Sequence, residues 1–310
     1  AYADLVCGEQ SVRLTVTQTA ASEVVDFTAQ FDPDFAKKLQ ELGHISDAEN
    51  ITSADMEKIA AITSLDVAGS YDNPGTLTSL RGIEYFESLT FLKCDYNSLE
   101  LLDVSENTAL TFLKCDSNQL TTLDVSANTA LTYLYCHSNQ LTTLDVSANT
   151  ALTTLSCSSN SLTKLDVRQN TELMNLSCSS NSLTSLDVSR NTALTGLWCE
   201  SNQLTELNVS ANTALTQLHC GSNQLTELDV RQNTALTGLW CYDNQLTELD
   251  ISRNTALTWL SCENNPGDGV STFPVKAWFD NDTVPAGLNV HSSSWTYGGK
   301  AITIDFRKAE

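Results

Sequence analysis

Cysteine recurs at a fixed interval of 21 residues through most of the 310-residue chain. The positions are Cys94, Cys115, Cys136, Cys157, Cys178, Cys199, Cys220, Cys241 and Cys262. A period held this strictly indicates one small structural unit that is copied along the chain. Each copy places the same side chain in the same environment, so the pattern predicts a solenoid rather than a globular domain.

Each repeat contains two similar halves, and its general form is L-T-x-L-x-C-x-x-N-x-L-T-x-L-D-V-S-x-N-T-A. Eight complete copies run from residue 89 to residue 256, and a ninth begins at Leu257 and breaks at Pro266. The apolar residues of Leu-x-Cys and Leu-x-Val point to the same side of an extended segment. Stacking in register at about 4.8 Å per coil then predicts two short parallel β-sheets that face each other across a narrow core.

The repeated cysteines are expected to be buried thiols. Stacked coils would hold neighbouring Cβ atoms about 4.8 Å apart, which exceeds the roughly 3.5–4.5 Å that is usual for a disulfide. The sequence contains no Cys-x-x-Cys pair, and its four histidines stand outside any metal-ligand spacing. We therefore expect neither a metal site nor a cofactor.

The repeat resembles the leucine-rich repeat, and in particular the 21-residue bacterial subtype in which cysteine replaces one leucine. The resemblance is to internalin J-like surface proteins with a cysteine ladder, and it covers residues 62–265. It implies a curved or nearly straight solenoid on an exported bacterial protein, secreted or at the cell surface, with a role in adhesion. Many leucine-rich repeats have a helix in their second half. Here the second half is strand-like, which predicts a slim coil with weak curvature.

The ends of a solenoid need polar caps over the exposed core. Upstream, Asp32-Pro33 predicts the start of a helix that ends at Gly43, Thr52 opens a second helix through a capping box, and residues 12–17 alternate like a strand. Downstream, residues 294–306 indicate a β-hairpin around two glycines. We therefore divide the chain into a strand segment with a small α-helical N-terminal cap (1–61), the leucine-rich-repeat solenoid (62–265), and a β-hairpin C-terminal cap or small β appendage (266–310).

The charge of the chain excludes several classes of partner. Lys and Arg number 16 against 38 Asp and Glu, a formal net charge of −22. Such a surface repels nucleic-acid backbones and anionic membranes. No apolar run approaches the roughly 18 residues that a membrane-spanning helix needs. We expect a monomer with no nucleic-acid partner and no membrane-spanning segment.

The outward positions of the first half-repeat vary between copies, and two groups of aromatic residues occur there. The Phe/Tyr cluster consists of Phe91, Phe112, Tyr133 and Tyr135. The Trp cluster consists of Trp198, His219, Trp240, Tyr242 and Trp259. A serine saddle separates them, made of Ser156, Ser158, Ser177 and Ser179. Exposed aromatic side chains gathered on one face favour a recognition surface. The alternative is cross-strand stacking that only stabilises the sheet.

The sequence contains no nucleophile elbow, no phosphate-binding loop and no histidine with a catalytic partner. It therefore predicts a non-enzymatic module that binds an extracellular protein or a neutral glycan, with both aromatic clusters as ligand-binding residues. The alternative function is a structural spacer or surface-coat module without a specific ligand. An enzyme would need a site in the terminal segments, where no catalytic pattern occurs.

Overall fold

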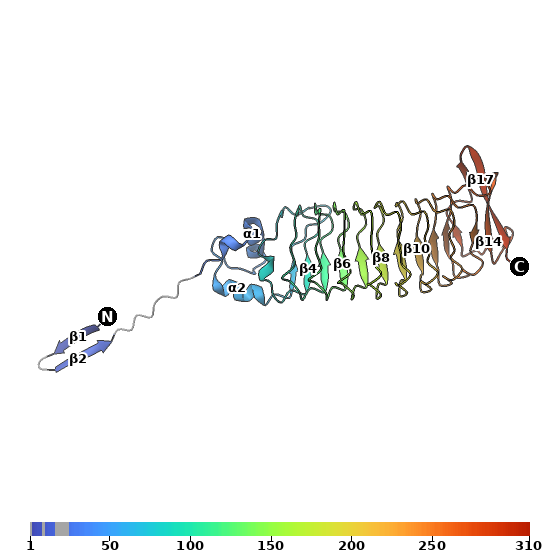
Figure 1. Ribbon diagram of the computed structural model, residues 1–310. Coiled ribbons are helices and arrows are strands. Elements are labelled where there is room, and N and C mark those ends of the chain that lie inside the picture. The colour runs from blue at the N-terminus through green and yellow to red at the C-terminus, as the bar shows by residue number, and fades with distance from the viewer. Residues whose placement is uncertain (1, 8–9, 16–24) are drawn as a thin grey trace.

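In a computed structural model, which describes residues 2–7, 10–15 and 25–310, the repeats form a slim and nearly straight solenoid (Figure 1). One long parallel sheet of eleven strands runs along it, in the order β15-β13-β11-β10-β9-β8-β7-β6-β5-β4-β3. Equivalent residues pair at every step, as Leu92 does with Leu113, so the coils stack in register. The repeat strands are β3 (Ser64–Asp66), β4 (Phe91–Lys93), β5 (Phe112–Lys114), β6 (Tyr133–Tyr135), β7 (Thr154–Ser156), β8 (Asn175–Ser177), β9 (Gly196–Trp198), β10 (Gln217–His219), β11 (Gly238–Trp240) and β13 (Trp259–Ser261).

The core of the solenoid consists of the repeated Leu, Val and Cys side chains, which are all buried. The nine repeat cysteines are free buried thiols that follow one another from coil to coil. Burial in this apolar interior disfavours the thiolate and raises their pKa, that of Cys157 to about 12. The predicted leucine-rich-repeat solenoid with its cysteine column is confirmed.

Polar side chains bond each coil to the next in the same way. The Asn118 Oδ1 accepts from the Leu99 amide at 2.9 Å, and its Nδ2 donates to the carbonyls of Cys94 at 3.0 Å and Cys115 at 3.1 Å. The Thr111 hydroxyl donates to the Thr90 carbonyl at 3.1 Å. The asparagine bonds recur in every following coil and the threonine bonds in nearly all, so the backbone groups of the turns are satisfied inside the stack.

The second half-repeat does not form the second sheet that its alternation predicts, and this part of the prediction is wrong. The Asp103 Oδ1 accepts from the Ser105 amide at 3.0 Å, which turns the backbone there. The Val104 carbonyl accepts from the Asn107 amide at 3.0 Å and from Asn128 Nδ2 at 2.9 Å, rather than from a neighbouring strand. Side-chain bonds of this kind compete with a strand ladder. In the described chain, strand pairing of this half occurs only at the end of the solenoid, around β12 (Leu249–Asp250).

The N-terminal segment contains the predicted helices. The Asp32 side chain caps α1 (Pro33–Glu41) by accepting from two backbone amides, and Thr52 with Asp55 forms the capping box of α2 (Ser53–Ala60). Phe31, Phe35 and Ile59 are buried in the common core, so this segment covers the first coil. The remaining elements are η1 (Thr28–Gln30), η2 (Ile83–Tyr85) and an antiparallel pair, β1 (Tyr2–Cys7) and β2 (Gln10–Thr15). The pair confirms the predicted strand up to residue 15; residues 16 and 17 lie outside the described residues.

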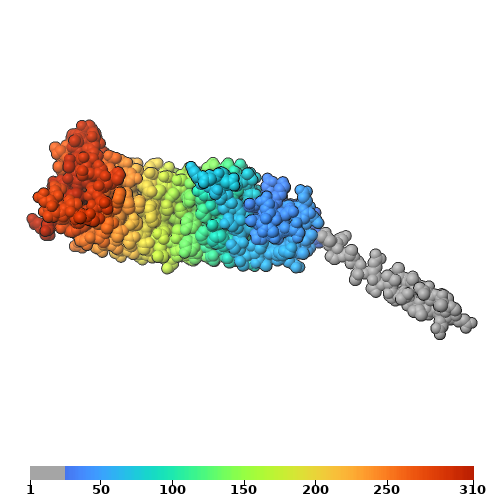
Figure 2. All heavy atoms as spheres, turned by 180° about the vertical axis from the view of Figure 1, so that it is seen from behind, coloured from blue at the N-terminus to red at the C-terminus, as the bar shows by residue number. Residues whose placement is uncertain are grey.

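The C-terminal segment forms a second, smaller sheet in the order β12-β14-β17-β16. Its strands are β14 (Thr272–Ala277), β16 (Ser294–Tyr297) and β17 (Lys300–Lys308), and Figure 2 shows that the segment widens one end of an otherwise even rod. Gly298 and Gly299, with φ of 55° and 80°, form the predicted hairpin turn. A short strand, β15 (Asn289–Val290), returns to extend the main sheet next to β13. No helix in the described ranges has the length and apolar character that crossing a bilayer requires.

Candidate functional site

The outward side of the main sheet, which we call the variable face, presents one side chain before and one after the buried leucine of each strand. In β9 these are Gly196 and Trp198, on either side of Leu197. Because the strands pair in register, equivalent positions of successive coils lie next to each other in columns. A third column follows the cysteine of each repeat. The residues that differ between copies therefore lie side by side and form one continuous surface.

The Trp cluster forms a stack of rings along this face. The rings of Trp198 and His219 have centroids 5.7 Å apart, those of His219 and Trp240 3.9 Å apart, and those of Trp240 and Trp259 6.3 Å apart. The His219 and Trp240 planes differ by 11°, so these two rings lie face to face. Four of the five predicted residues therefore share one stack.

Glycines allow the large rings to lie flat against the sheet. A Cβ atom on Gly196 would lie 2.3 Å from the Trp198 ring, and one on Gly238 would lie 2.4 Å from the Trp240 ring. The fifth predicted residue, Tyr242, lies over Gly221 in the same manner, 2.6 Å from where a Cβ would be. Any larger residue at these three positions would push the ring away from the backbone.

The Phe/Tyr cluster also comes together, around Phe112. The Phe112 ring stacks on Phe91 at 4.4 Å between centroids and contacts Tyr133 at 5.9 Å and Tyr135 at 5.7 Å. Between the two clusters the Ser158 and Ser177 hydroxyls share a hydrogen bond of 2.7 Å. The serine saddle is thus a polar stretch of the same face with smaller side chains.

The aromatic residues are less exposed than the sequence suggests. Tyr133, at 42%, and Trp259, at 36%, are exposed, whereas the other seven predicted residues are half-buried. The reason is the stacking itself, since each ring covers part of the next one. The variable face therefore presents the faces and edges of packed rings rather than isolated side chains.

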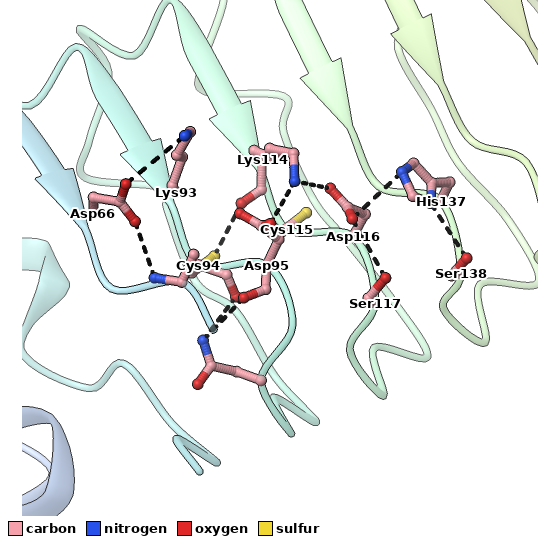
Figure 3. A network of polar contacts seen from close by, with 12 residues as sticks. Asp66, Lys93, Cys94, Asp95, Lys114, Cys115, Asp116, Ser117, His137 and Ser138 are labelled. Carbon is pink, nitrogen blue, oxygen red and sulfur yellow. Dashed lines mark hydrogen bonds and ion pairs between the residues drawn. The ribbon is translucent and has the colours of Figure 1, made fainter. Parts of the chain in front are cut away.

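Charged residues beside the Phe/Tyr cluster contact one another in a polar network, shown in Figure 3. The Lys114 ammonium pairs with the Asp95 carboxylate and lies 3.1 Å from Asp116 Oδ1. The His137 Nε2 lies 3.3 Å from the second oxygen of Asp116, and Lys93 lies 3.8 Å from Asp66. Asp95 and Asp116 are buried by these contacts. Desolvation opposes the effect, but the two carboxylates hold the pKa of Lys114 above its ordinary value.

The surroundings of the Trp cluster differ. Burial between the indole rings lowers the pKa of His219, so its imidazole is neutral at neutral pH. Burial, together with the nearby carboxylates of Glu200 and Asp243, raises the pKa of the Tyr242 hydroxyl. At the end of the stack, Glu263 accepts from the Ser261 hydroxyl at 2.8 Å and lies 2.8 Å from His291 Nδ1.

His291 belongs to the variable face although it lies outside the repeats. It follows β15, and its ring contacts that of Trp259 at 6.5 Å between centroids. The sequence analysis did not place it there. A signal was available, because Leu288-Asn289-Val290-His291 repeats the alternation of the first half-repeat.

Comparison with solved structures finds the same architecture. The functional domain of InlJ from Listeria monocytogenes, which includes a cysteine ladder, is 37% identical with a TM-score of 0.76; the match covers 93% of this chain and 63% of that one. The chain thus spans somewhat less than two thirds of the InlJ structure.

More distant structures share the fold. Internalin C2 of Listeria monocytogenes is 20% identical with a TM-score of 0.60, over 74% of this chain and all of the other. A leucine-rich-repeat protein of Leptospira interrogans is 21% identical with a TM-score of 0.54, over 81% of this chain and 76% of the other. Neither a protein-family model nor a curated protein matches the sequence. From its repeat, its sheet and its likeness to the InlJ domain, the chain is a leucine-rich-repeat protein of the cysteine-ladder type.

Proposed function

We propose that the protein is a non-enzymatic binding or adhesion module that recognises an extracellular protein or a neutral glycan through the variable face. The ring stack of Trp198, His219 and Trp240 is the observation that carries this proposal. The sheet already holds these rings in place, so their ordering costs little on binding. Tryptophan is also enriched among the residues that dominate binding energies.

The wider setting of this proposal comes from similarity. An internalin-like leucine-rich-repeat fold suggests a protein-binding or adhesion module, and InlJ is a Listeria protein. We therefore propose a secreted or cell-surface location in a bacterium. The Phe/Tyr cluster is proposed as a second contact area, and the division at residues 61 and 265 as the division into caps and solenoid.

The double variant Trp198→Ala/Trp240→Ala tests the proposal. The intact chain is first screened on arrays of glycans and of extracellular proteins, and each ligand found is titrated in solution. The double variant should lose about 2 kcal/mol of binding free energy, roughly thirtyfold in Kd. Leu101→Ala is the matched control, because Leu101 is a large exposed residue in the second half-repeat, away from the variable face.

The alternative, a structural spacer, is favoured by a specific observation: the rings stack on one another and are half-buried. Under this alternative the double variant would unfold at a temperature several degrees lower and bind every array ligand as the parent does. Under the proposed function the loss of binding exceeds the loss of stability.

A further inference from the structure

The Trp cluster is bordered by a carboxylate that the molecule leaves without a partner. Glu200 occupies the third column of the variable face, two coils before Tyr242. Its Oε2 is buried, and among the described residues none donates a hydrogen bond to it. Its neighbour in the next coil is Gly221, over which the Tyr242 ring lies.

The other buried carboxylates of this face each contact a cation or a hydroxyl, although one oxygen of Asp95 and one of Asp116 also lack a hydrogen-bond donor among the described residues. Asp95 and Asp116 share Lys114, and Asp116 also contacts His137. Glu263 accepts from Ser261 and contacts His291. Against this pattern, the unpaired state of Glu200 stands out as a property of the Trp cluster.

No lysine or arginine of the solenoid is placed to pair with Glu200, whose charge acts instead on the half-buried His219 and opposes the lowering of its pKa by burial. Between Lys114 and Lys276 every lysine and arginine belongs to the second half-repeat, away from the variable face: Lys164, Arg168, Arg190, Arg231 and Arg253. Arg168 and Arg231 pair with aspartates of their own turns. The Trp cluster therefore combines aromatic rings with uncompensated negative charge on a chain whose net charge is −22.

A carboxylate without a counter-charge or a donor destabilises the free protein, so a cationic ligand that pairs with it gains binding free energy. Indole and phenol faces attract cations, most strongly where water is excluded. A guanidinium or ammonium group meets both requirements at once, since it can lie on a ring and donate to a carboxylate.

We infer that the Trp cluster accepts a lysine or arginine side chain of a protein partner, with Trp240 or Tyr242 under the cation and Glu200 as its counter-charge. This inference rests on the proposed function and selects a basic protein segment over a neutral glycan. The Tyr242 ring lies over Gly221, so the cation approaches Glu200 across the outer face of this ring.

The probe is a flexible, end-capped peptide with two arginines between glycines, and its control is the same peptide with uncharged citrulline in place of arginine. Binding is followed through the tryptophan fluorescence of the intact chain. The arginine peptide should bind at least about tenfold more tightly than the citrulline peptide. Glu200→Gln should abolish most of this preference while its melting temperature stays equal to that of the parent or rises.

Glu227→Gln is the matched control for general attraction between a cationic peptide and an acidic protein, because Glu227 is exposed in the second half-repeat. Equal binding of the two peptides, or equal losses in Glu200→Gln and Glu227→Gln, would overturn the inference. If an array ligand depends on Trp198 and Trp240 but not on Glu200, the inference fails and the proposed function stands. If it depends on neither, both fail.

Discussion

The two halves of the variable face have the same backbone structure but differ in whether their carboxylates have a cation to pair with. In the half around Phe112, Lys114 pairs with the buried carboxylates Asp95 and Asp116, and the His137 ring contacts Asp116. In the half around Trp240, the Glu200 carboxylate has a buried oxygen to which none of the described residues donates a hydrogen bond. Aromatic residues alone do not distinguish a binding surface from a stabilising one on such a scaffold. The polar groups beside them add a second criterion, because a paired charge stabilises the folded protein, whereas a carboxylate without a counter-charge would gain from a cationic ligand.

The largest expected effect comes from removing Lys114, the cation that pairs with the two buried aspartates beside the Phe/Tyr cluster. Lys114→Met leaves Asp95 and Asp116 buried without their shared ammonium group. We expect a loss of about 3 kcal/mol in the free energy of unfolding, measured by urea denaturation, since breaking a buried ion pair strands the remaining charge. Lys93→Met should cost less than about 1 kcal/mol, because Lys93 pairs with an exposed aspartate. Equal losses in the two variants would show that the network does not stabilise the fold.

A smaller difference is expected between the central rings of the two halves. Phe112 contacts three aromatic rings, whereas Trp240 contacts His219 and Trp259. Phe112→Ala should therefore lower the free energy of unfolding by about 2 kcal/mol and Trp240→Ala by about 1 kcal/mol. Thermal and urea unfolding of both variants measure this directly. A greater loss for Trp240→Ala would show that the Trp cluster stabilises the fold more than the Phe/Tyr cluster does, which would contradict this prediction.

The smallest effect concerns the titration of His219. Its pKa is lowered by burial, so the unfolded chain binds a proton more readily than the folded one. Stability should fall as the pH drops below about 6.5, the pKa of an unperturbed histidine, and should level off below the folded pKa. An NMR titration should place the His219 midpoint below about 6.5, and His219→Gln should remove this part of the pH dependence. A midpoint at or above the unperturbed value would contradict the burial seen between the indoles.

The repeat pattern was sufficient to predict the stacked core, because each buried position recurs every 21 residues. The columns of the variable face followed from the same register, so both aromatic clusters could be named from the sequence. The second sheet was predicted wrongly, since Leu-x-Val alternates like Leu-x-Cys. What alternation does not show is that Asp103 turns the chain through its own side chain, or that Asn128 takes the Val104 carbonyl.

The charge pairing on the variable face could not be predicted from the columns. Lys114 and Asp116 are two residues apart in one coil, but Asp95 and His137 reach them from the coils on either side. Such contacts depend on side-chain directions that a periodic pattern leaves open. The same is true of Ser138 and its equivalents, which adopt positive φ before each turn asparagine although no glycine marks the position.

The bonds made by Asn118 and Thr111 recur from coil to coil, and this repetition makes length itself adjustable. Removing or adding one 21-residue unit within the serine saddle would recreate the same bonds across the new junction. The two aromatic clusters would move closer together or further apart by one rung, about 4.8 Å, and keep their orientation. The number of coils between the clusters thus sets the distance that a ligand would have to bridge to contact both of them.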